Sequence, residues 1–232
     1  MSQKKFFGML TLIVGVMLVF SLIGCDDGTT GDPDPQFQLP VPDLLDPYIG
    51  ETLDISEQVF SESNGTIIPF NGNLSVSSWR FIDGTANINN GRLSFTVGTP
   101  SPLVPIADIL EDGSGSWYKN FRYSITDVQS AYLYDGELDG NQDFSWLEKR
   151  RDTDYSFEHV SYIYVDKDVT VTAEGKVVID DGYTTTSADI ILELKRGWNA
   201  AYFRMASTDT THRNANVIYC MGETNELNWI LY

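Results

Sequence analysis

Apolar and polar residues alternate with a period of two along most of the chain beyond residue 48. Three clear examples are the sets Leu93/Phe95/Val97, Ile190/Leu192/Leu194 and Leu227/Trp229/Leu231. This spacing, with β-branched and aromatic residues at the apolar positions, is typical of strands that bury one face. We therefore predict a nearly all-β domain over residues 49–232, with its last strand paired inside a sheet.

Turn dipeptides separate these alternating segments. They are Asn64-Gly65, Asn71-Gly72, Asp83-Gly84, Asn90-Gly91, Asp112-Gly113, Asp135-Gly136, Asp139-Gly140 and Asp181-Gly182. Asn-Gly and Asp-Gly supply the positive φ angles of tight hairpins. Many short strands without alternating helices imply an antiparallel sandwich or barrel. We predict the antiparallel β-sandwich, as one domain or as two β subdomains divided near residue 115.

One short helix is expected near residues 105–112. Pro105 stands at its start and Gly113 follows its end, which is the usual punctuation of a helix. We expect one or two turns that cross between sheets.

The chain begins with a basic and then apolar segment. Lys4 and Lys5 precede an apolar run over residues 6–23. Gly24 and Cys25 follow this run and complete the motif Leu22-Ile23-Gly24-Cys25. This segment resembles the signal peptide and lipobox of bacterial lipoproteins. The resemblance implies cleavage after Gly24, leaving residues 1–24 as the signal peptide and Cys25 as the lipidated first residue. The alternative is an uncleaved membrane span, for which a run of about 18 residues is just long enough.

Residues 25–48 have the composition of a lipidated, flexible tether. Asp, Gly, Thr and Pro dominate, with prolines at 33, 35, 40, 42 and 47, and such a segment buries no core. Both interpretations of the N-terminus export the rest of the chain and attach it to a membrane. Asp26 and Asp27 lie where lipoproteins carry sorting signals, and inner membrane, outer membrane and cell surface all remain open.

The charge of the chain is strongly negative. Its formal net charge is −18, and cleavage would remove Lys4 and Lys5 but no acidic residue. Nucleic acids and anionic lipid surfaces attract clustered basic residues, so this balance argues against either as a partner. The charge is explained by solubility, or alternatively by a cationic or calcium-bridged partner.

One acidic segment partly matches the spacing of a calcium loop. Oxygen-bearing side chains recur at Asp135, Glu137, Asp139, Asn141 and Asp143, with Gly140 at the sixth position. Glu137 departs from the pattern, and Trp146 occupies the twelfth position, where a bidentate Glu belongs. The alternative is a solvated hairpin loop. We therefore expect weak calcium binding or none, and no other cofactor.

Tryptophans are the remaining candidate ligand-binding residues. Trp117, Trp146 and Trp198, if exposed, would stack on sugar rings or anchor a protein partner; burial in the core is the alternative. The only histidines, His159 and His212, lie in no catalytic motif, so we predict no enzymatic activity.

Two further segments carry a second resemblance. The run YVDKDVTV over residues 164–171 and the run KRGWN over residues 195–199, taken as strand-turn-strand, are similar to a pattern in uncharacterised bacterial all-β lipoproteins. That resemblance implies the kind of protein but no activity. We expect a lipid-anchored envelope or surface protein with a non-catalytic binding or structural role and an unidentified protein or glycan partner. A carbohydrate-binding module is the alternative, and a hydrolase is the third interpretation.

Overall fold

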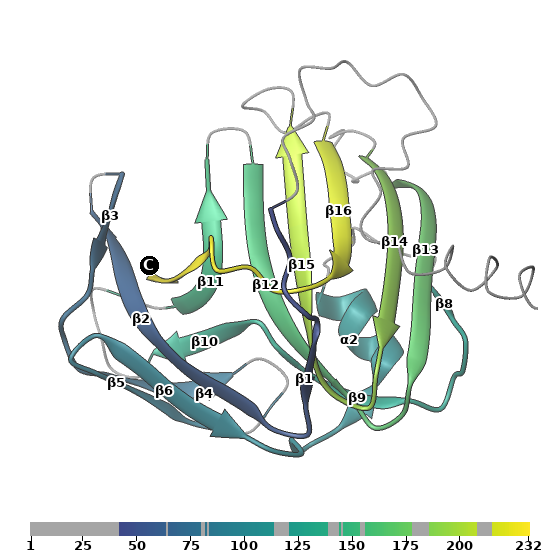
Figure 1. The fold of residues 1–232 in the computed structure, drawn as a ribbon, viewed down its shortest axis with the longest axis horizontal. Coiled ribbons are helices and arrows are strands. Elements are labelled where there is room, and N and C mark those ends of the chain that lie inside the picture. The colour runs from purple at the N-terminus through teal and green to yellow at the C-terminus, as the bar shows by residue number, and fades with distance from the viewer. Residues whose placement is uncertain are drawn as a thin grey trace, which may run out of the picture. The chain divides into compact units, whose positions relative to one another are not determined.

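The computed structural model describes residues 42–63, 65–79, 82, 84–113, 121–138, 144, 146–153, 156–177, 186–207 and 215–232. These residues all belong to one compact unit. They form an all-β fold with one very short helix, α2 (Ile106–Gly113) (Figure 1). The all-β class and the position of the helix are confirmed.

Seven of the described strands close into a barrel. In order around the barrel they are β2 (Leu53–Ser63), β6 (Arg92–Val97), β5 (Ala86–Asn89), β4 (Leu74–Trp79), β10 (Asp135–Leu138), β11 (Trp146–Asp152) and β17 (Asn228–Leu231). The barrel closes because β17 pairs in parallel with β2, with Trp229 beside Val59. The structure is therefore a closed, mixed barrel with extra strands, where the sequence pattern had predicted an antiparallel sandwich.

The barrel interior is filled by the alternating apolar residues of its strands. Trp79 and Trp229 are buried, and their rings lie 6.0 Å apart in an edge-on arrangement. Gly136 on β10 permits this packing, since a Cβ there would lie 2.9 Å from the Trp79 ring and 2.7 Å from Val76. The last strand is confirmed as a paired element, because Trp229 and Leu231 are fully buried between β2 and β11.

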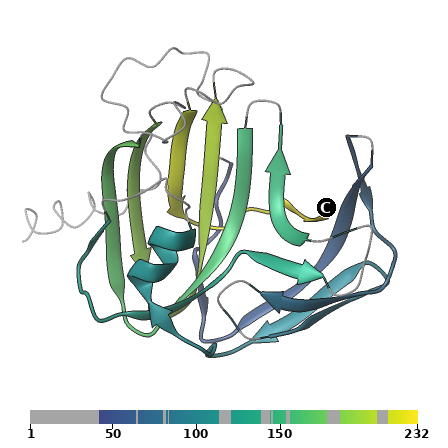
Figure 2. The same ribbon diagram turned by 180° about the vertical axis from the view of Figure 1, so that it is seen from behind.

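The remaining strands extend this barrel into a sheet. Beyond β11 the order is β12 (Ser156–Val165), β15 (Gly197–Ser207), β16 (Ala215–Met221), β14 (Thr186–Leu194), β13 (Val169–Val177) and β8 (Arg122–Tyr123). Shorter strands flank it: β9 (Gln129–Leu133) beside β12, β7 (Val104–Pro105) beside β9, and β1 (Tyr48–Gly50) beside β15. Helix α2 covers one face, where Ile109 and Leu110 pack in a core with Ile163 and Leu192 (Figure 2).

The segments β14 and β15 are consecutive strands but not a hairpin. They are joined by residues 195–196, yet β16 lies between them, antiparallel to β15 and parallel to β14. Gly197 has a φ of +105°, and a Cβ there would lie 2.6 Å from the Gly50 carbonyl oxygen. The start of β15 therefore pairs with β1, and the expected strand-turn-strand forms without pairing between its two strands.

The segment before β1 is bound to the domain. The Leu45 amide donates to the Glu223 carbonyl at 2.7 Å, and the Ala200 amide donates to the Pro47 carbonyl at 2.7 Å. These bonds place the last residues assigned to the tether, and Tyr48 in β1, within the folded unit.

Candidate binding site

Strand β11 carries the charges that organise this part of the molecule. Its sequence alternates, so Lys149 and Arg151 point to the face shared with Leu147, while Glu148 and Arg150 point to the opposite face. Basic residues are scarce in the chain, and three of them are consecutive here. Lys149 and Arg151 are held by carboxylates from other strands or loops, and Arg150 by carboxylates of β11 itself.

Lys149 is a buried cation between two carboxylates. Its Nζ donates to Glu57 Oε1 and to Glu223 Oε1, at 2.9 Å each, and its side chain is 1 % exposed. The Tyr162 hydroxyl donates to the same Glu223 oxygen at 2.7 Å. Burial, followed by the Glu223 charge, raises the pKa of Tyr162 well above its usual value, so the phenol stays a donor. This network neutralises a charge that would otherwise be costly to bury.

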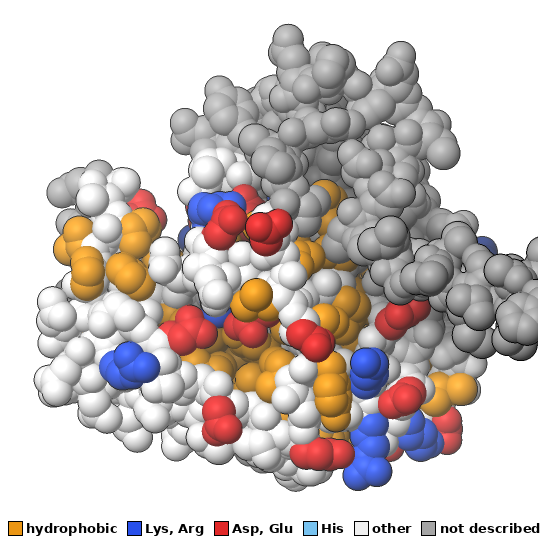
Figure 3. Space-filling model, viewed as in Figure 1, with side chains coloured by type: hydrophobic (Ala, Val, Ile, Leu, Met, Phe, Trp, Pro, Cys, Tyr) orange, Lys and Arg blue, Asp and Glu red, His pale blue; other side chains and the backbone are white. Residues whose placement is uncertain are grey.

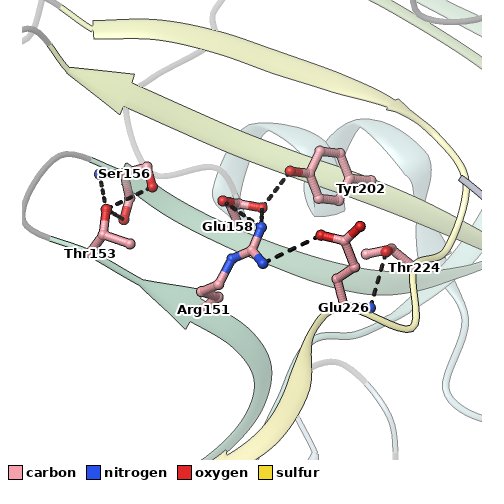
Figure 4. A network of polar contacts seen from close by, with 7 residues as sticks. All are labelled: Arg151, Thr153, Ser156, Glu158, Tyr202, Thr224 and Glu226. Atoms are coloured by element: carbon pink, nitrogen blue, oxygen red, sulfur yellow. Dashed lines mark hydrogen bonds and ion pairs between the residues drawn. The ribbon is translucent and has the colours of Figure 1, made fainter. Parts of the chain in front are cut away.

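Arg151 forms a second network on the same face (Figure 4). Its Nη2 donates to both carboxylate oxygens of the buried Glu158, at 2.9 and 3.1 Å, and its Nη1 donates to Glu226 at 3.4 Å. The Tyr202 hydroxyl donates to Glu158 at 2.6 Å, and burial is the main cause of its raised pKa. The connection between β16 and β17 carries Glu223 and Glu226, so both networks fasten it to β11.

The opposite face of β11 holds a third set of polar contacts. Glu148 accepts from the Tyr134 hydroxyl at 3.2 Å and pairs with Arg150 at 3.3 Å. Arg150 also pairs with Asp152 at 2.6 Å and lies 3.8 Å from the centre of the Tyr232 ring. A guanidinium that is paired and stacked in this way is held in one orientation. These contacts are best explained as a scaffold for the barrel wall.

His159 is poorly suited to acid–base catalysis. It is 8 % exposed, and its ring lies 4.7 Å from that of Phe203 and 4.5 Å from that of Tyr134. Burial, with a smaller effect from Arg150, lowers its pKa to about 3, so the imidazole is neutral near pH 7. The second histidine, His212, lies outside the described residues. The geometry around His159 therefore does not favour the hydrolase interpretation.

The three candidate tryptophans have different positions. Trp146 begins β11 and is 40 % exposed, while Trp117 lies outside the described residues. Trp198 is fully buried, and its Nε1 donates to the Gly98 carbonyl at 2.8 Å. Trp198 is thus a core residue, which corrects its candidacy as a ligand-stacking side chain. The ring of Tyr164 packs against it edge-on, at a centroid distance of 5.6 Å.

The acidic segment does not begin as a loop. Asp135 and Glu137 lie in β10. This strand pairs with β4 on one side and with β11 on the other, so it forms part of the barrel wall. Asp135 is buried, whereas Glu137 is exposed and accepts from the Ser78 hydroxyl at 3.1 Å. Asp139, Asn141 and Asp143 lie outside the described residues. In the described part of the chain, no three His, Cys, Asp or Glu side chains gather as a metal site.

The β2–β3 hairpin exposes an apolar surface that the sequence analysis did not single out. Strand β3 (Thr66–Pro69) pairs with β2, and Ile67 and Ile68 are 45 % and 44 % exposed. Consecutive strand residues point to opposite faces, so the hairpin is apolar on both sides. Figure 3 shows apolar side chains gathered where this hairpin projects from the body. The signal in the sequence was two adjacent isoleucines after an Asn-Gly turn.

One row of side chains links this hairpin to Trp146 along the outside of the barrel. Glu62 is paired with Ile67, and Trp146 is paired with Glu137. The backbones of Trp146 and Tyr232 exchange two hydrogen bonds, at 3.0 and 3.2 Å, and Tyr232 follows Leu231, which lies beside Ser61. Paired residues share a face. We call these five residues the outer row: Ile67, Glu62, Tyr232, Trp146 and Glu137.

Comparisons with known protein families, with curated proteins and with solved structures found no match to this chain. Cys25 and the rest of the N-terminal segment to residue 41 lie outside the described residues. Within the described ranges, no helix combines the length and apolarity needed to cross a bilayer.

Proposed function

We propose that this chain is an exported, lipid-anchored envelope or surface protein whose β domain has a non-catalytic binding role. The lipobox-like run ending at Cys25 supports the anchor. The observation that supports binding is the pair Ile67 and Ile68, exposed on both faces of a projecting hairpin. Clustered exposed apolar side chains commonly mark interaction sites. The charged side chains of β11, by contrast, are engaged in networks that hold the barrel together.

The anchor is tested at Cys25. Replacing Cys25 by Ser removes the sulfur to which lipid would attach, so we expect labelling by a fatty-acid probe to be abolished and signal-peptide processing to be blocked. Labelling is read on a gel after metabolic incorporation of the probe, with the unmodified chain as the positive control. Unchanged labelling of the Ser variant would remove the anchor from the proposal.

A carbohydrate-binding role is the alternative, and the exposure of Trp146 is the observation that favours it. A half-exposed indole beside a carboxylate suits stacking on a sugar ring with hydrogen bonds to its hydroxyls. Affinity electrophoresis through gels that contain soluble polysaccharides tests it. Retardation that is lost in Trp146→Ala but kept in Tyr48→Ala, another exposed aromatic, would favour this alternative.

A further inference from the structure

We propose that the outer row and the β2–β3 hairpin dock a basic, amphipathic polypeptide segment of a partner protein. This inference rests on the proposed binding role and names the class of partner. Its test keeps Cys25 in every variant and measures peptide binding, so its failure and the failure of the anchor proposal are distinguishable.

The apolar part of the surface is fixed by backbone pairing. Ile67 is held by the β2–β3 ladder, and Trp146 is held by its two bonds to Tyr232 and its pairing with β10. Their side chains are 45 % and 40 % exposed. Apolar groups that are already ordered before binding lose little conformational entropy on contact with a partner. The row therefore offers preorganised contacts for apolar side chains.

The charge on this surface specifies a basic partner. Glu62 and Glu137 are exposed members of the outer row, and in the described part of the chain neither forms an ion pair. Strands β2, β3, β4, β10 and β17 contain no Lys or Arg, and Arg150 of β11, which stacks on Tyr232, is already paired with Glu148 and Asp152. With a net charge of −18, the chain attracts cationic segments and repels acidic ones.

The same residues disfavour other occupants. Glu62 lies near the end of the hairpin, where a membrane-inserting element would need apolar side chains, and the acidic row repels anionic lipid. The branched side chains of Ile67 and Ile68 offer no flat face for a sugar, so within this surface a glycan would stack only on Trp146 or Tyr232. Pro69 has no N–H with which to bond an added strand, so docking proceeds through side chains.

The test is surface plasmon resonance on the full chain in zwitterionic nanodiscs, with empty nanodiscs as the reference. The probe is a short peptide of alternating lysine and leucine, and its counterpart alternates glutamate and leucine. We expect the lysine peptide alone to bind, more weakly as salt rises. Ile67→Ser and Glu62→Gln should each weaken binding by about fivefold or more, as expected for residues at the centre of an interface.

Two matched variants act as controls, both on β14. Ile191 is 48 % exposed, like Ile67, and Glu193 is exposed, like Glu62. Ile191→Ser and Glu193→Gln should leave binding unchanged, and circular dichroism melts should show that all four variants are folded. Absence of binding, equal binding of the glutamate peptide, or equal losses in the β14 variants would overturn the proposal. So would binding of glycans alone, or occupation of the row by a second copy in light scattering.

Discussion

At the scale of single residues, Lys149 holds together segments that are distant in the chain. Replacing it by Met would leave Glu57 and Glu223 facing each other without the cation. Because both carboxylates reach solvent in part, we expect a loss of about 2–3 kcal/mol in the free energy of unfolding, below the full cost for a buried pair. Urea denaturation measures it. The control is Lys167→Met, which removes the exposed ion pair with Asp127. It should leave the free energy of unfolding unchanged.

His159 predicts a pH dependence of stability. The unfolded chain titrates at this residue near pH 6.5 and the folded chain at about 3, so between these values the unfolded state binds more protons. Acidification from pH 6.5 towards 3 should therefore lower the free energy of unfolding by about 1.4 kcal/mol per pH unit from this group. His159→Phe, which suits the surrounding aromatic rings, should remove that contribution. Equal slopes for both proteins in urea titrations from pH 4 to 7 would contradict the assignment.

At the scale of elements, β17 closes the barrel. Deleting residues 227–232 removes Leu227, Trp229 and Leu231, which are all buried, and each such side chain contributes about 1.5–3 kcal/mol. The deletion also leaves the facing edges of β2 and β11 unpaired. We expect aggregation or loss of the cooperative thermal transition in calorimetry. The exposed substitution Asn228→Ala in the same strand is the control, and a truncated chain that melts like its parent would make β17 peripheral.

The local sequence pattern was sufficient to predict the strands, but not which strands lie next to one another. The alternation around Leu93 and around Trp229 correctly predicted the buried faces of these strands, because alternation depends only on residues close in the sequence. The pairing of β17 with β2, and the insertion of β16 between β14 and β15, depend on packing between segments far apart in the chain. A turn such as that at Gly197 is compatible with either a hairpin or a crossover.

The candidate site shows the same division. Both Trp146 and Trp198 were candidates, but Trp198 lies in the core because Tyr164 and Gly98, which are distant in the chain, contact its ring. From the local sequence, Ile67 and Ile68 would be expected to be buried. Their exposure follows from the length of β2, which extends past the barrel wall. The exposure of Ile67 and Ile68 depends on where the neighbouring strands end, which cannot be predicted from the local sequence.

At the scale of the whole molecule, residues 45–48 are part of the fold. A chain starting at residue 50 lacks the bonds from Leu45 and Pro47 and the pairing of Tyr48, whereas one starting at residue 32 keeps them. We expect both to be soluble and β-rich, given the high negative charge. The shorter chain should melt several degrees lower in scanning calorimetry. Equal melting temperatures would show that residues 44–48 add nothing to stability.

The parallel pairing of the last strand with β2 also governs when the molecule can finish folding. Val59 and Trp229 are neighbours in space but about 170 residues apart in the chain, a separation associated with slow closure. While the polypeptide is still being made, the barrel lacks its closing strand. The sheet of β12, β13, β14, β15 and β16 can assemble first, but the barrel is completed only after β17 has been made. Until then, the edges of β2 and β11 are unpaired, and unpaired strand edges are prone to aggregation and to binding by chaperones.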